Sequence, residues 1–132
     1  MANVLLVDDE PGILLMLRVA LESSGHEATT AADGREALDA LAADSFDIVL
    51  CDLMMPVLDG WGVLEAVRSM SAPPVVVVSA KSGPDDIRRA LDAGAADFVS
   101  KPFSPFDLVD IVERLAGAGP DEVAAHRAAR RP

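Results

Sequence analysis

The sequence predicts a doubly wound α/β fold in which a five-stranded parallel sheet carries helices on both faces. Short apolar runs alternate along the chain with segments of helical periodicity, which is the pattern of repeated strand and helix units. Two of the runs, residues 48–51 and 75–78, are continuously apolar, as expected for central strands covered on both faces. With 132 residues, the chain has the length of one domain with a single core.

Five strands are expected, near residues 3–7, 27–31, 47–51, 74–78 and 97–100. The second of them, Glu27–Ala31, is more polar than the others and suits an edge of the sheet. Right-handed crossovers between these strands give the flavodoxin-like order 2-1-3-4-5. In such a sheet the ligand site lies beyond the carboxyl ends of strands 1 and 3.

Helices are expected near residues 12–24, 34–43, 60–70, 85–93 and 105–116. The last is the clearest because its apolar residues recur at i, i+3, i+4 and i+7: Leu108, Ile111, Val112 and Leu115. Prolines stand near three helix starts and glycines just past two helix ends, where each is favoured: Pro11, Pro84, Pro105, Gly25 and Gly94.

The domain is expected to comprise residues 1–116. From Gly117 on, a Gly-Ala-Gly-Pro segment leads into an end rich in alanine and arginine, which carries too few apolar groups to pack. We therefore predict that residues 117–132 form a flexible tail or a truncated linker.

Composition indicates which partners the chain can have. Its net charge of −11 argues against direct binding to nucleic acid and favours protein partners. Apolar stretches fall short of the about 20 residues of a membrane span, and no basic region precedes the first strand, as it would in a signal peptide. The single cysteine cannot form an internal disulfide. We expect a cytoplasmic protein without membrane contact.

Charged residues follow three of the predicted strands. Asp8, Asp9 and Glu10 follow the first strand, Asp52 follows the third, and Lys101 follows the fifth. Two carboxylates roughly 4 Å apart repel by about 4 kcal/mol at an effective dielectric near 20, so a cation must accompany them. Lysine supplies one charge, and Mg²⁺ prefers carboxylates, waters and a phosphate oxygen. The pattern indicates a site for a phosphoryl group and its metal.

With these residues in hand, the chain resembles the receiver domain of bacterial two-component response regulators over residues 3–116. The resemblance depends on Val7-Asp8-Asp9-Glu10, Asp52 followed by Met55-Pro56 and Asp59-Gly60, Ser79-Ala80 after the fourth strand, and Lys101-Pro102-Phe103. Each motif is weak alone, but their order and their places at strand ends make the combination specific.

The resemblance implies a role for each residue of the site. Asp52 would accept a phosphoryl group from a histidine kinase or a histidine phosphotransfer protein, in a Mg²⁺-dependent reaction. Asp8, Asp9, Asp52 and the backbone carbonyl of Met54 would hold the metal. Lys101 would pair with Asp52 or with the phosphoryl oxygens. Such a domain catalyses only its own phosphorylation and dephosphorylation.

The resemblance also implies a switch. The Ser79 hydroxyl would bond to the phosphoryl group, and Phe98 would rotate inward behind it. The face made by the fourth helix, fifth strand and fifth helix would then change shape and control a partner or an output domain. The Lys101–Pro102 peptide is expected to be cis, and Gly60 is expected to serve a turn with positive φ.

Simpler structural interpretations exist for most of these residues. Asp8-Asp9 could only cap the following helix, and Asp52 could be a turn residue at the end of a strand. Trp61 and the Met54-Met55 pair are interpreted as packing residues. The coincidence of the aspartates with Lys101 favours the functional interpretation of the acidic residues.

Two other classes of protein use comparable folds. A haloacid-dehalogenase-like phosphatase needs a second aspartate two residues after its nucleophile, where this chain has Met54. A flavodoxin needs a Ser/Thr/Gly-rich phosphate loop after strand 1, where this chain has Asp8-Asp9-Glu10-Pro11. The carboxylates there would repel a flavin phosphate, so both classes are disfavoured.

The output of the domain is less defined. Regulators with winged-helix outputs tend to carry an acidic residue before the aspartate of strand 5 and an arginine in helix 5, where this chain has Ala96 and Ile111. We therefore expect a monomer or a weak phosphorylation-dependent dimer. The chain is either a single-domain regulator or the receiver part of a longer protein.

Overall fold

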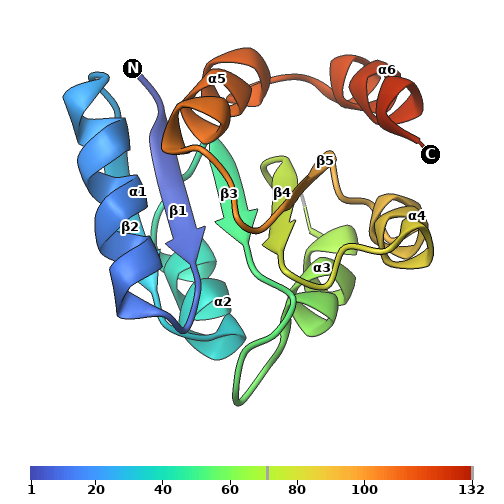
Figure 1. Ribbon diagram of the computed structural model, residues 1–132, viewed down its shortest axis with the longest axis horizontal. Helices are drawn as coiled ribbons and strands as arrows, with labels where there is room; N and C mark the ends of the chain where they lie inside the picture. The colour runs from blue at the N-terminus through green and yellow to red at the C-terminus, as the bar shows by residue number, and fades with distance from the viewer. Residues whose placement is uncertain (71, 132) are drawn as a thin grey trace.

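The computed structural model describes residues 1–70 and 72–131 and contains a five-stranded parallel sheet (Figure 1). The strands are β1 (Asn3–Val7), β2 (Glu27–Ala31), β3 (Ile48–Cys51), β4 (Val75–Ser79) and β5 (Asp97–Ser100). Their order is β2-β1-β3-β4-β5, so the predicted order and the edge position of β2 are confirmed. Every predicted strand lies within one residue of the observed one.

Helices cover both faces of the sheet. The helices are α1 (Pro11–Ser23), α2 (Gly34–Ala43), α3 (Gly60–Arg68), α4 (Pro84–Asp92), α5 (Pro105–Leu115) and α6 (Pro120–Arg130). Alternate residues of a strand point to opposite faces, so Leu6 packs in a core with α1 and α5 while Leu5 packs in a second core with α2, α3 and α4. None of the helices in the described ranges is long and apolar enough to cross a membrane.

The predicted helix boundaries agree with the structure. Pro11, Pro84 and Pro105 each occupy the first turn of a helix, and Gly25 and Gly94 have φ angles of +88° and +106°. Gly60, in contrast, does not have the positive φ that we predicted. It is the buried first residue of α3, and a side chain there would collide with the Asp52 carbonyl oxygen and come within 2.6 Å of the Leu53 Cα.

The prediction of a flexible tail after residue 116 was wrong for the described residues. Residues 120–130 form α6, although Val123 is its only buried residue within the described part of the chain. The helix is held by polar contacts from His126, Arg127 and Arg130 to β5 and to the turn before it. Counting apolar groups could not find this helix, because its packing depends on arginine and histidine. Pro132 lies outside the described residues.

Candidate functional site

The carboxyl ends of β1 and β3 bring four acidic residues together. Val7 pairs with Cys51 in the sheet, and the Asp52 N–H donates to the Val7 carbonyl at 2.9 Å, so the residues that follow each strand are neighbours. One carboxylate oxygen from each of four residues lies within 4.8 Å of the others: Asp8, Asp9, Glu10 and Asp52. Asp8 and Asp52 are buried, with 4% and 5% of their surfaces exposed, whereas Asp9 and Glu10 are exposed.

Lys101 reaches this acidic group from the end of β5. Its Nζ donates to Asp8 Oδ2 at 2.8 Å, to Asp52 Oδ2 at 3.0 Å and to Glu10 Oε1 at 3.3 Å. The remaining oxygens of the two buried aspartates accept backbone N–H groups, Asp8 Oδ1 from Glu10 at 3.0 Å and Asp52 Oδ1 from Met54 at 3.2 Å. The two buried carboxylates are therefore held in fixed orientations.

Burial and charge shift the pKa values of the site. Burial raises the pKa of Asp8, and the hydrogen bond from Lys101 only partly opposes it. Burial lowers the pKa of Lys101, but hydrogen bonds and charges from Asp8 and Asp52 raise it more, so the lysine stays protonated. Burial and then the charge of Asp52 raise the pKa of the neighbouring Cys51, which keeps that thiol protonated.

The acidic group fits a hard divalent cation. Lys101 supplies one positive charge to four carboxylates, which leaves the pocket with an excess of negative charge. The donors are all carboxylate oxygens, as Mg²⁺ prefers, and two of them are exposed enough to leave room for waters and a phosphate oxygen. A cavity of about 440 Å³ opens beside Lys101 between α1 and the loop that precedes α5.

Capping does not account for the first aspartates. The N-cap residue of α1 is Glu10, which directly precedes Pro11, and no side-chain hydrogen bond caps this helix. Glu10 itself is the site residue that we did not assign from the sequence. It appeared in the motif, but only the fold shows that the first turn of α1 directs its carboxylate toward Lys101.

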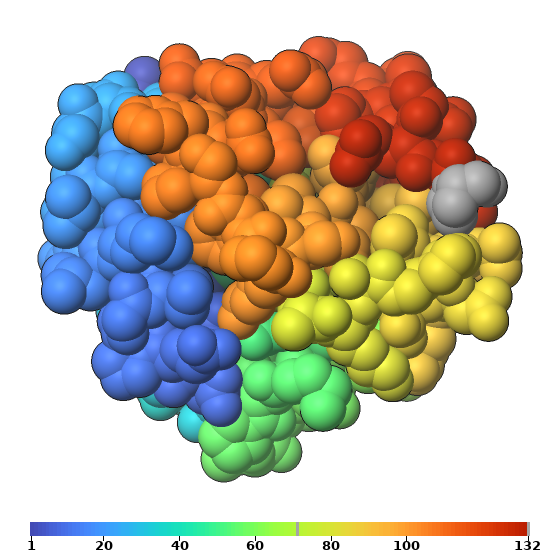
Figure 2. All heavy atoms as spheres, viewed as in Figure 1, coloured from blue at the N-terminus to red at the C-terminus, as the bar shows by residue number. Residues whose placement is uncertain are grey.

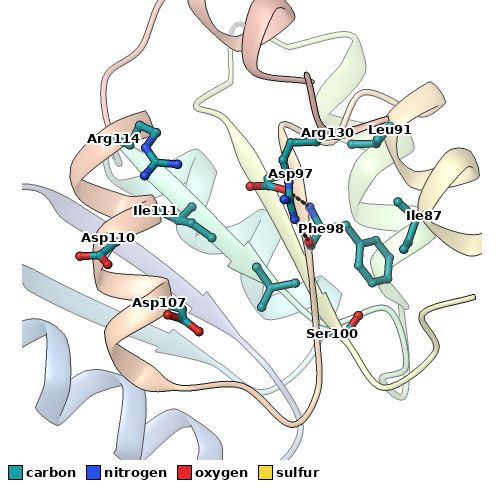
Figure 3. Close-up of a pocket in the computed structure, with 11 residues that line it drawn as sticks. Ile87, Leu91, Asp97, Phe98, Ser100, Asp107, Asp110, Ile111, Arg114 and Arg130 are labelled. Carbon is teal, nitrogen blue, oxygen red and sulfur yellow. Dashed lines mark hydrogen bonds and ion pairs between the residues drawn. The ribbon is translucent and has the colours of Figure 1, made fainter. Parts of the chain in front are cut away.

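Ser79 and Phe98 lie at the ends of the neighbouring strands. Ser79 is the fully buried last residue of β4, and its Oγ accepts the Lys81 N–H at 3.2 Å. Phe98 is 4% exposed and packs in the core beside α4 (Figure 3). The ring is buried in this structure of the unmodified chain. Its inward rotation on phosphorylation stays a prediction.

The loop between β3 and α3 differs in part from its prediction. Met55 and Trp61 pack against the core as expected, but Met54 is 60% exposed, so its interpretation as a packing residue was wrong. Its amide contacts Asp52, and the role of its carbonyl as a ligand stays a prediction. The Lys101–Pro102 peptide is cis, which confirms that expectation.

Comparisons with known proteins agree with this geometry. The family model of the response regulator receiver domain matches residues 4–113. The chain belongs to this family. Receiver domains are phosphoacceptor modules of two-component signalling rather than true enzymes, they receive the phosphoryl group from histidine kinases, and they bind Mg²⁺ at this acidic cluster.

Curated relatives of this receiver domain are transcriptional regulators. The chain is 45% identical over 118 residues to the transcriptional regulatory protein KdpE of Mycobacterium tuberculosis, covering 89% of the chain and 51% of that protein. It is 37% identical over 122 residues to the DNA-binding response regulator MtrA of Mycolicibacterium smegmatis, covering 92% of the chain and 54% of that protein. The chain thus spans about half the length of these relatives.

Solved receiver structures match the fold closely. The Francisella response regulator 1452 receiver domain has a TM-score of 0.84 at 33% identity, over 87% of this chain and 96% of that one. The receiver domain protein of Methanospirillum hungatei JF-1 has a TM-score of 0.80 at 25% identity, over 98% of both chains.

Proposed function

We propose that Asp52 is the residue that accepts the phosphoryl group. The observation that carries this proposal is the position of Lys101 Nζ, 2.8 Å from Asp8 Oδ2 and 3.0 Å from Asp52 Oδ2, within one acidic group. An oxygen of Asp52 attacks the phosphorus of a phosphohistidine, the phosphorus–nitrogen bond breaks as the new phosphorus–oxygen bond forms, and the imidazole leaves with the electron pair.

The neighbouring residues prepare Asp52 for this reaction. Asp8, Asp9, Asp52 and the Met54 carbonyl would hold Mg²⁺, with Glu10 close enough to join them. Bound Mg²⁺ supplies the positive charge that the pocket lacks. Lys101 orients the Asp52 carboxylate before transfer and neutralises phosphoryl oxygens after it.

The same proposal gives Ser79 and Phe98 the role of a switch. Ser79 ends β4 and Phe98 lies beside Val77 in the adjacent strand, so both residues adjoin the strand ends that form the acidic pocket. A hydrogen bond from the Ser79 hydroxyl to the phosphoryl group would move the β4–α4 loop. Phe98 packs in the same core cluster as Ile87 of α4, the helix that follows this loop. The face made by α4, β5 and α5 would change shape in response.

We further propose that this face acts on a protein partner or on an output domain, in the cytoplasm. The net charge of −11 disfavours direct binding of this domain to nucleic acid. The relatives' names support a regulatory role in transcription for longer proteins of this kind.

Acetyl phosphate with Mg²⁺ tests the assignment of Asp52. The intact protein should gain the mass of one phosphoryl group, and Asp52→Asn should gain none. Asp59→Asn is a matched control, because Asp59 lies in the same loop and caps α3 through the Gly62 N–H. A mass gain that persists in Asp52→Asn would contradict the proposal, as would the absence of any gain in the unaltered chain.

A further inference from the structure

The last helix is attached to β5 through a set of polar contacts. In Figure 1, α6 follows α5 and lies near β5, away from the carboxyl ends of the strands where the acidic residues gather, and Figure 2 shows it at the surface of the molecule. Arg127 donates to the Gly94 carbonyl at 3.0 Å and to the Ala95 carbonyl at 2.8 Å. Arg131 pairs with Asp92 at the end of α4 at 2.7 Å. Helix α6 therefore joins both β5 and the end of α4.

Asp97 is the centre of this attachment. Its side chain is only 3% exposed, and His126 Nε2 lies 2.8 Å from its Oδ2. Its Oδ1 accepts from Arg130 Nε at 2.7 Å and from the Phe98 N–H at 2.7 Å. Two side chains of α6 thus hold a buried carboxylate, which would lose those partners if the helix left.

The attachment also reaches the residue of the proposed switch. Arg130 donates from its second nitrogen to the Phe98 carbonyl at 3.4 Å. Phe98 therefore lies in a four-residue strand that α6 holds at one end, while Lys101, directly after the strand, binds Asp8 and Asp52. A displacement of β5 at the Lys101 end would therefore also change the contacts that α6 makes with Asp97 and Phe98.

Helix α6 lines part of a groove on the face of α4, β5 and α5. The groove has a volume of about 460 Å³, and its walls include Ile87 of α4, Ile111 and Arg114 of α5, and Arg130 of α6 (Figure 3). A partner that enters this groove near Asp97 must compete with Arg130 for the space. The receiver family model ends at residue 113, so α6 lies outside the part of the chain that this model matches.

We propose that α6 is an autoinhibitory latch, a helix that docks on Asp97, closes one end of the groove and is released when Asp52 is phosphorylated. This inference rests on the proposed function, because it needs the phosphoryl group to reshape β5. Any change of Phe98 or Lys101 that weakens the contacts of α6 with β5 favours release. By reciprocity, loosening α6 favours the phosphorylated form to the same extent.

Hydrogen exchange of the intact chain tests the release. With Mg²⁺ and beryllofluoride, which mimics the phosphoryl group, amides of residues 121–131 should exchange about fivefold faster or more. Asp52→Asn should show no such change. Equal or slower exchange in α6, in a chain that does gain a phosphoryl group from acetyl phosphate, would overturn the latch alone. A chain that gains no phosphoryl group would overturn both proposals.

Substitutions in α6 test the reciprocal effect. Arg130→Ala and His126→Ala should each raise the ratio of phosphorylated to unmodified chain, at a fixed concentration of acetyl phosphate, by about fivefold. Arg35→Ala is the control, because Arg35 is also an exposed arginine, and it is paired with Asp39 on α2. Since Arg130 is half exposed, its truncation leaves the core intact, and circular dichroism checks this. A ratio that stays at the unaltered value in both variants would overturn the latch.

Discussion

In the described part of the chain, buried aspartates lie near both ends of β5, and their surroundings differ in charge balance. In the acidic pocket, Lys101 faces four carboxylates, so negative charge is in excess. At the other end, the single carboxylate of Asp97 faces His126 and Arg130 and also accepts a backbone N–H. The first cluster is completed only by a ligand, whereas the second is satisfied within the chain. Charge imbalance therefore separates a binding site from a structural contact built of the same residue types.

Removing the lysine should have the largest effect on stability. In EDTA, Lys101→Met should lower the free energy of unfolding by about 3 kcal/mol, because two buried carboxylates lose their cation. Added Mg²⁺ should restore more stability to this variant than to the unaltered chain. Urea unfolding with EDTA or Mg²⁺ measures both effects.

Lys81→Met provides the control for that measurement. Lys81 pairs with Asp86 at 3.7 Å on the surface and should contribute less than about 1 kcal/mol. If Mg²⁺ stabilised the Lys101 and Lys81 variants equally, the lysine would not be compensating the excess charge of the pocket.

At Asp97, where His126 and Arg130 balance the carboxylate, removing the charge should destabilise the chain. Asp97→Asn should lower the free energy of unfolding by about 2 kcal/mol, because charged hydrogen bonds from α6 are lost in a buried position. Mg²⁺ should not alter this difference. Asp92→Asn is the matched control, since Asp92 bonds Arg131 at 2.7 Å but is exposed, and it should change stability little. A loss for Asp97→Asn no larger than that of the control would show that α6 adds little at this position.

The same contrast explains what the sequence could and could not predict. Asp8, Asp52 and Lys101 were found because each directly follows an apolar strand, and the order of a parallel sheet then fixes which strand ends meet. Helix α6 was missed because its attachment depends on side chains that are ordinarily solvated. Asp97 was visible only as a residue of β5, and nothing in its local sequence indicated that His126 and Arg130, 29 and 33 positions later, would bind it.

Details of close packing were also beyond the sequence. Glycine at residue 60 suggested a left-handed turn. In the structure, glycine is needed there because the backbone of Asp52 and Leu53 lies too close to the start of α3 to leave room for a side chain. The exposure of Met54 depends on how the β3–α3 loop leaves the sheet, which periodicity does not describe.

In the acidic pocket, loss of a charge should stabilise the chain instead. At neutral pH in EDTA, Asp8→Asn should raise the free energy of unfolding by about 1 kcal/mol, because it removes a buried charge from a group with excess negative charge. Mg²⁺ should bind this variant more weakly. Asp9→Asn, a change at an exposed member of the same group, should stabilise less.

The pH dependence of that effect follows from the raised pKa of Asp8, whose largest cause is burial. A carboxyl with a higher pKa in the folded chain stabilises the fold when protonated. This contribution is complete below the ordinary aspartate pKa of about 4 and is lost as pH rises through the raised value. The advantage of Asp8→Asn over the unaltered chain should therefore grow between acid and neutral pH. A constant or shrinking advantage in urea unfolding across that range would contradict this assignment.

A further effect of about the same size as that of Asp8→Asn concerns the backbone near each group of buried aspartates. Val57, in the loop that follows Asp52, has a φ of +68° and is 81% exposed, whereas the turn before Asp97 places Gly94 at its positive φ. A β-branched residue is strained in this region, while asparagine tolerates it, so Val57→Asn should raise the free energy of unfolding by about 1 kcal/mol. Gly94→Ala should lower it by a similar amount. Thermal unfolding measures the change in stability of each variant, which should be positive for Val57→Asn and negative for Gly94→Ala. A destabilised Val57→Asn would mean that the valine side chain makes a contact that stabilises the fold by more than its backbone strain costs.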